Sequence, residues 1–139
     1  MAPAEARASY YGAPGPPLSL PQTLSGTVAV PLAERPAEAA DTLAALYPAL
    51  AACWQPPEGA GDAGVEVTAR FSLRRDGSLI AAPRIVFTAG VSGEGRRRLA
   101  RATLAALRAC TPARITPDLG RAIAGRPIAL RLVQRRRAP

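Results

Sequence analysis

The residue types that usually carry catalysis are scarce in this chain. It contains no histidine, lysine or asparagine, and all 18 of its basic residues are arginine. A Ser-His-Asp or Cys-His arrangement, an imidazole metal ligand and a lysine Schiff base are therefore all excluded. Ser92, Asp76 and Glu94 have no plausible base among the remaining residues, and turn geometry explains Asp76 better. The sequence predicts a protein that is not an enzyme and has no catalytic residue, metal or cofactor.

Two cysteines, Cys53 and Cys110, are the remaining reactive side chains. They form no CxxC motif, and without histidine they have no natural partners for a metal site. An even pair in a small domain permits one disulfide, which would imply an oxidising compartment. Two separate buried thiols fit the sequence about as well, so the residues alone leave both states open.

The arginines are concentrated in the second half of the chain. Residues 1–64 carry a net charge of −4, whereas residues 65–139 carry +12. Such a half attracts anionic partners such as nucleic acid, phosphate or an acidic protein or lipid face. Codon bias toward GC-rich codons would also enrich arginine, so the charge has a compositional interpretation as well. The densest basic patch is Arg96, Arg97, Arg98 and Arg101.

These residues must be positioned by a single domain, because 139 residues is a typical one-domain length. We expect a Pro/Gly-rich extended segment over 1–35, a folded domain over 36–134 and a basic tail over 135–139. A short extended piece at 27–30 could pack along the domain. No window is long and apolar enough to span a membrane, and the first eight residues do not resemble a signal peptide. Two alternatives follow: the protein is cytosolic, or a signal or anchor lies outside this sequence.

Helical patterns occur in three places. Residues 36–54 have one apolar stripe with Pro48 inside it, which predicts a helix that is kinked at Pro48 or split there into two turns. Residues 92–110 form a second amphipathic helix that Ser92 can cap. Thr116 and Pro117 begin a short helix, over 117–124, which Gly125 closes.

Strand patterns alternate between apolar and polar residues over 65–75 and 79–87, joined by the hairpin signal Asp76-Gly77. Pro83 predicts a bulge or an unpaired side in the second strand, and a last strand covers 128–133. The expected fold is α+β, with a three-stranded antiparallel sheet formed by the hairpin and the C-terminal strand. Two main helices would pack on one face of that sheet.

An ordered set of motifs extends this interpretation to a family. A helix ends in Trp54-Gln55-Pro56-Pro57, a strand enters an Asp-Gly turn within 71–79, and an alanine-rich helix ends in Cys110-Thr111-Pro112. Over residues 38–134 this order resembles the C-terminal domain shared by TonB and TolA, the energy transducers of the cell envelope. The TolA-like branch is the most similar, and there the two corresponding cysteines can pair. The resemblance therefore implies a Cys53–Cys110 disulfide and a periplasmic location.

The resemblance also implies a function, because TonB and TolA domains recruit partner segments by adding a strand to a sheet edge. We expect this edge at the last strand, with an envelope protein or peptide segment as partner and a homodimer through the same edge as a second arrangement. A small-molecule substrate is not expected. The alternatives are an anion- or nucleic-acid-binding domain, which the few aromatic residues disfavour, and a structural envelope domain. The predicted edge residues are Ile128, Ala129, Leu130, Arg131, Leu132 and Val133.

Overall fold

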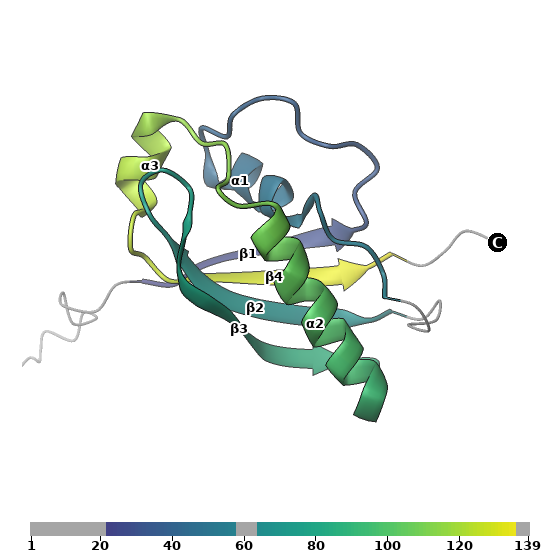
Figure 1. Ribbon diagram of the computed structural model, residues 1–139. Coiled ribbons are helices and arrows are strands. Elements are labelled where there is room, and N and C mark those ends of the chain that lie inside the picture. The colour runs from purple at the N-terminus through teal and green to yellow at the C-terminus, as the bar shows by residue number, and fades with distance from the viewer. Residues whose placement is uncertain (1–21, 58–63, 136–139) are drawn as a thin grey trace, which may run out of the picture.

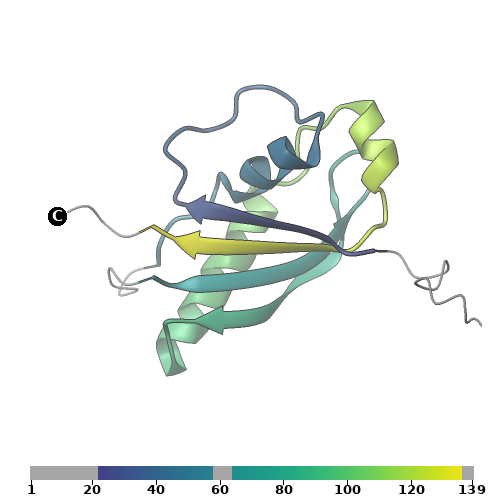
Figure 2. The ribbon, with the colours of Figure 1, turned by 180° about the vertical axis from the view of Figure 1, so that it is seen from behind.

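The computed structural model describes residues 22–57 and 64–135. Most of the Pro/Gly-rich opening and all but one residue of the basic tail lie outside these ranges. The described residues form a twisted sheet with helices on one face and an open opposite face (Figures 1 and 2). The elements are β1 (Leu24–Val30), α1 (Leu43–Ala51), β2 (Glu66–Leu73), β3 (Leu79–Ala89), α2 (Gly93–Ala109), α3 (Pro117–Ile123) and β4 (Ile128–Gln134).

The sheet has four strands in the order β1-β4-β2-β3. β4 is antiparallel to β2, β2 is antiparallel to β3, and β1 runs parallel to β4. The expectation of an α+β fold is met, but the prediction of a three-stranded antiparallel sheet is wrong because β1 adds a fourth, parallel strand. The folded sheet therefore includes residues that precede position 36.

β1 joins the sheet because its side chains alternate in the way a half-buried strand requires. Leu24, Val28 and Val30 are buried in the core, whereas the odd-numbered side chains between them are exposed. Gly26 interrupts the apolar series, and prolines flank the segment in the sequence. These features weaken the strand signal and explain why only a short extended piece at 27–30 was expected.

Helix α1 begins later than its apolar stripe suggests. Thr42 is its N-cap and accepts a hydrogen bond from the Ala45 amide at 3.2 Å. Just before the helix, Ala40 forms an isolated parallel bridge with Ile115 instead of a helical turn. Pro48 lies inside the helix as expected, and the helix continues past it to Ala51.

The core lies between the sheet and helices α1 and α2. Leu46, Leu99 and Leu130 are fully buried within it, and each such side chain stabilises the fold by about 1.5–3 kcal/mol. The Trp54 indole N–H donates to the buried Thr103 hydroxyl at 3.1 Å. This bond satisfies both polar groups and joins the end of α1 to the middle of α2.

Candidate functional site

β4, the strand expected to be the open edge, lies inside the sheet between β1 and β2. Its alternate residues Ile128, Leu130 and Leu132 are buried in the core. On the open face, the Arg131 guanidinium donates two hydrogen bonds to the Glu66 carboxylate, at 2.6 and 2.8 Å. The prediction that residues 128–133 form an exposed edge is therefore wrong, because β1 covers the side of β4 that was expected to be free.

The Arg131–Glu66 pair ties β4 to β2 on the open face. The hydrogen bond from Arg131 lowers the pKa of the Glu66 carboxyl below its usual range. The same contact raises the pKa of the Arg131 guanidinium. Both changes favour the charged pair, so this residue of the predicted edge strand has a structural partner within the sheet.

The open edge on this side of the sheet is β1, and not β4 as the sequence predicted. The Leu24 amide donates to the Pro127 carbonyl at 2.8 Å, and the Val30 carbonyl accepts from the Arg135 amide at 2.7 Å. Both groups point toward β4, and successive residues of a strand point their backbone groups to opposite sides. The backbone N–H and C=O groups of Ser25, Thr27 and Ala29 therefore point to the outer edge.

An apolar groove of about 620 Å³ runs between this edge and helix α1. Tyr47 forms part of its wall, and its ring lies directly against Gly26, where any Cβ would collide with it. Burial raises the pKa of the Tyr47 phenol, with a smaller opposing effect from Arg126. The groove carries no charged side chain among the residues that line it, which include Thr27, Val28, Ala29, Leu43, Ala44 and Tyr47.

The opposite edge of the sheet, β3, has a different character. Its register with β2 shifts twice, and Ala81 has a φ of 60°. Pro83 lies at the shift between Arg70 and Ser72, where β2 skips from Arg84 to Ile80, which confirms the predicted bulge. Ile80, Val86 and Phe87 are the exposed large apolar side chains of the described chain, and all three lie on this strand.

The predicted basic patch is divided by the structure. Arg96 and Arg97 line a groove of about 530 Å³ with Val86 and Phe87 of β3. Arg97 also pairs with Glu94 at 3.3 Å on the exposed surface. Arg98 and Arg101 are exposed on the same helix but do not line the groove. Helix α2 thus brings half of the patch to the β3 edge.

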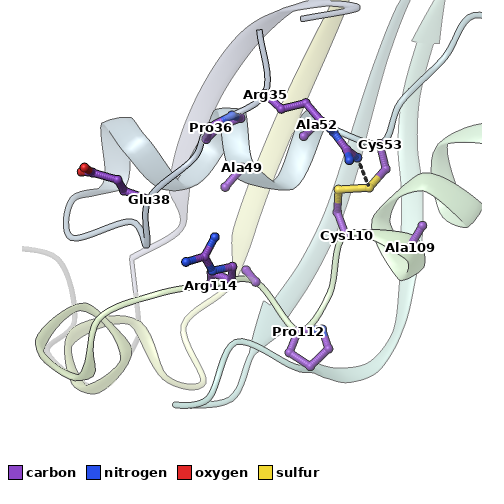
Figure 3. Close-up of a pocket in the computed structure, with 11 residues that line it drawn as sticks. Arg35, Pro36, Glu38, Ala49, Ala52, Cys53, Ala109, Cys110, Pro112 and Arg114 are labelled. Atoms are coloured by element: carbon purple, nitrogen blue, oxygen red, sulfur yellow. Dashed lines mark hydrogen bonds between the residues drawn. A yellow bond between two sulfur atoms is a disulfide. The ribbon is translucent and has the colours of Figure 1, made fainter.

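The cysteines form the disulfide that the resemblance implied. Cys53 follows α1 and Cys110 is the C-cap of α2, and their sulfur atoms are 2.03 Å apart. The Arg35 guanidinium donates to the Cys53 sulfur at 3.3 Å, in a pocket of about 310 Å³ (Figure 3). A disulfide persists in an oxidising environment, so the structure indicates an extracytoplasmic location.

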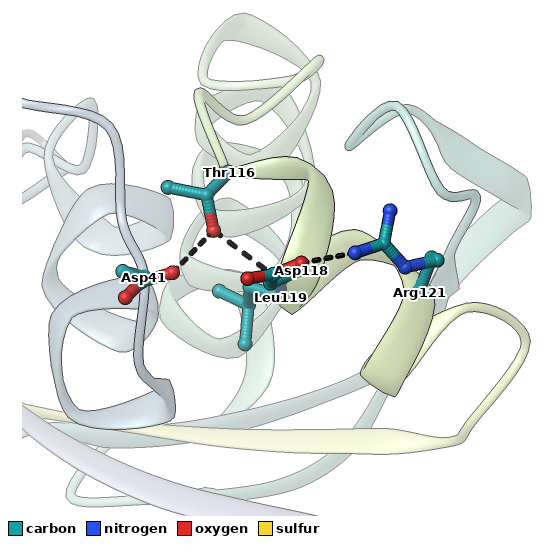
Figure 4. A network of polar contacts seen from close by, with 5 residues as sticks. All are labelled: Asp41, Thr116, Asp118, Leu119 and Arg121. Carbon is teal, nitrogen blue, oxygen red and sulfur yellow. Dashed lines mark hydrogen bonds and ion pairs between the residues drawn. The ribbon is translucent and has the colours of Figure 1, made fainter.

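A polar network joins α3 to the loop that precedes α1, and its role is structural. The Thr116 hydroxyl caps α3 by accepting from the Leu119 amide at 3.2 Å, as the sequence predicted. It donates to the Asp41 carboxylate at 2.5 Å, while Asp118 pairs with Arg121 (Figure 4). These contacts fix α3 to the loop that precedes α1.

The part of the chain that the structure describes lacks two further features, a metal-binding cluster and a membrane-spanning helix. No group of three or more histidine, cysteine, aspartate or glutamate residues there could hold a metal ion. None of the helices within 22–57 and 64–135 is long and apolar enough to cross a membrane.

Comparison with known proteins places the chain in one family. Residues 36–136 match the family model described as Uncharacterised conserved protein UCP034077, and the chain belongs to that family. No curated protein and no solved structure matches the chain. The family description names no function, so the resemblance to the TonB and TolA domains stays a prediction.

Proposed function

We propose that this protein is a periplasmic protein-binding module that captures an extended segment of an envelope protein as a fifth strand beside β1. The observation that carries the proposal is the outward direction of the backbone groups of Ser25, Thr27 and Ala29. Unpaired groups in a regular row provide the main-chain hydrogen bonds of strand addition. The disulfide supports an extracytoplasmic location, and the resemblance to TonB and TolA domains supports the periplasm and this mode of binding.

β1 is a better template than β3 because it lacks the features that protect exposed edges. Natural edge strands are blocked by charges, prolines and bulges. β1 contains no charged residue and no proline, and its register with β4 is continuous over seven residues. β3 carries Pro83, Arg84 and two register shifts. A partner strand can therefore pair with β1 over its whole length.

The groove defines the chemistry of the partner segment. Alternate side chains of an added strand would point toward α1 and meet Leu43, Ala44 and Tyr47. A charged side chain there would lose part of its hydration, and none of the residues that line the groove carries a charge to pair with it. We therefore expect an extended segment with uncharged, apolar residues at every second position.

Thr27→Pro is the direct test of this function. The Thr27 amide points away from β4, so proline removes an outward donor without breaking the internal ladder. The probe is a phage-displayed library of strand-length peptides, selected on the immobilised protein. Selected peptides should share the alternating apolar pattern and should lose measurable binding to Thr27→Pro.

Thr27→Val is the matched control, because it changes the same side chain and keeps the amide. It should bind the selected peptides as the original protein does. The proposal would be overturned if every selected peptide bound Thr27→Pro as well as it binds the original protein. If analytical ultracentrifugation shows a dimer that Thr27→Pro dissociates, the partner strand at β1 comes from a second copy of the chain and not from another protein. An edge that captures neither would leave a structural envelope domain.

A further inference from the structure

The three exposed large apolar side chains of the described residues are gathered on one strand, β3. Val86 and Phe87 are about half exposed, at 52% and 51%, and they are consecutive in the sequence. A single exposed apolar residue needs no explanation, but a cluster on one element indicates a contact surface. The register shift between Thr68 and Ala69 lies opposite this pair.

Three arginines lie near the apolar pair. Arg96 and Arg97 lie across the groove on α2, and Arg84 is exposed two residues before Val86 on the strand itself. Among the described residues at this surface, the ion pairs include one acidic partner, Glu94, which contacts Arg97. The surface therefore combines exposed apolar side chains with positive charge.

This edge is poorly suited to recognition through the backbone. Pro83 lacks an amide, Ala81 has a φ of 60°, and the register is interrupted twice. A partner that pairs as a strand needs a regular row of donors and acceptors. Recognition at β3 must therefore rest on its side chains.

We propose that the surface formed by Val86, Phe87, Arg84, Arg96 and Arg97 binds anionic phospholipid membranes. Guanidinium groups make bidentate hydrogen bonds to phosphate. Apolar side chains next to basic ones can enter the boundary between headgroups and acyl chains, which a soluble polyanion does not offer. The oxidising location that the disulfide indicates is also a space bounded by lipid.

The membrane surface and the proposed strand-addition site lie on opposite edges of the sheet. The strand order places β4 and β2 between them, as Figure 2 shows. A partner segment on β1 would therefore leave the surface at β3 accessible. Thr27→Pro should not change membrane binding, so each proposal can fail without the other.

Co-sedimentation of the full chain with vesicles tests this inference. One set of vesicles contains phosphatidylcholine alone, and the other contains phosphatidylcholine and phosphatidylglycerol in equal parts. The protein should pellet with the anionic vesicles, and binding should weaken as salt screens the arginines. The variant Val86→Ser/Phe87→Ser should reduce the partition coefficient by about tenfold, since it removes the apolar area that Val86 and Phe87 would bury in the membrane.

The paired variants Arg96→Gln/Arg97→Gln and Arg108→Gln/Arg121→Gln separate a local site from overall charge. Both remove two exposed arginines, but the second pair lies outside the groove. The first pair should lose about fivefold in partition coefficient for each arginine. The second pair should lose much less. All variants alter exposed residues, and thermal unfolding checks that each remains folded.

Four results would overturn the proposal. The first is equal pelleting of the protein with both kinds of vesicle, or with neither. The second is full binding by Val86→Ser/Phe87→Ser, which would show attraction by charge alone. The third is an equal loss in the two arginine pairs, which would show an effect of net charge. Heparin is the soluble comparison. The fourth result is heparin binding that Val86→Ser/Phe87→Ser weakens as much as it weakens vesicle binding, which would assign the surface to soluble polyanions instead.

Discussion

The two edges of the sheet present different parts of the chain to solvent. β1 offers regular backbone groups beside an uncharged groove, whereas β3 offers apolar and basic side chains on an irregular backbone. An edge can attract a partner through either kind of group, but the bulges that protect β3 from strand pairing also turn its side chains outward. The comparison shows how one small sheet can carry two contact surfaces with separate chemistry.

The edges are not mechanically independent. Helix α1 packs on β1, and helix α2 packs on β2 and β3. The Cys53–Cys110 disulfide joins the ends of these helices, and the Trp54–Thr103 hydrogen bond joins the end of α1 to the middle of α2. Changes in the protein can therefore be chosen to loosen both edges, one edge or neither.

The largest effect is expected from Cys53→Ser/Cys110→Ser. The sequence separation is 57 residues, so loss of the bridge should lower the free energy of unfolding by about 4 kcal/mol in the chain-entropy model. Urea unfolding measures the loss. Hydrogen exchange should accelerate in both β1 and β3, because the bridge joins their covering helices. Faster exchange at one edge alone would show that the edges are held separately.

Gly77→Ala should loosen the β3 side. The sequence predicts a positive φ here, and the structure confirms it with a φ of 88°. A Cβ would also collide with the Ala113 backbone, so we expect a loss of about 2–3 kcal/mol. Gly125→Ala is the control, because it shares a positive φ of 77° but has open space around it. Equal losses in the two variants would remove the collision from the explanation.

Gly26→Ala should loosen the β1 side by a smaller amount. The new Cβ meets the Tyr47 ring rather than backbone, and a side chain can move, so we expect a loss of about 1–2 kcal/mol. Thermal unfolding and hydrogen exchange at β1 measure the effect. Gly95→Ala makes only ordinary contact with Val91, at 3.7 Å, and should be neutral or slightly stabilising. If Gly26→Ala leaves the stability and the hydrogen exchange of β1 unchanged, the contact between Gly26 and the Tyr47 ring does not stabilise β1.

Glu66→Gln should give the smallest effect, because it changes an exposed pair in the middle of the sheet. The pKa of the Glu66 carboxyl is lowered in the folded protein. Its contribution to stability is therefore present above the unfolded pKa of about 4.3 and is lost as the pH falls through the folded pKa. Urea midpoints of the two proteins should differ at neutral pH and converge in acid. A difference that persists in acid would assign the effect to packing.

Local patterns in the sequence predicted much of the fold. The hairpin at Asp76-Gly77, the helix α2 and the Thr116 cap each depend on neighbouring residues, and all three appear in the structure. The disulfide came from the resemblance. Half of the basic patch, Arg96 and Arg97, also forms part of a surface groove.

Long-range pairing could not be predicted from such patterns. Pairing of Leu24 with Ile128 joins residues from opposite ends of the chain, and Gly26 weakens the only local signal for β1. Likewise, Pro36 suggested an early helix start, but Ala40 instead forms hydrogen bonds with Arg114 and Thr116. Both errors arose where a distant backbone partner competed with local preference.

The parallel pairing of β1 with β4 determines how the domain would carry a pulling force. Leu24 lies beside Ile128 and Val30 beside Gln134, so the chain enters at one end of this strand pair and leaves at the other. Tension between the two ends would slide β1 lengthwise along β4 and load every hydrogen bond between them at once. Separation in this shear geometry requires all of these bonds to break together, whereas peeling breaks them one at a time. The arrangement is therefore suited to a domain that must stay folded while it is stretched.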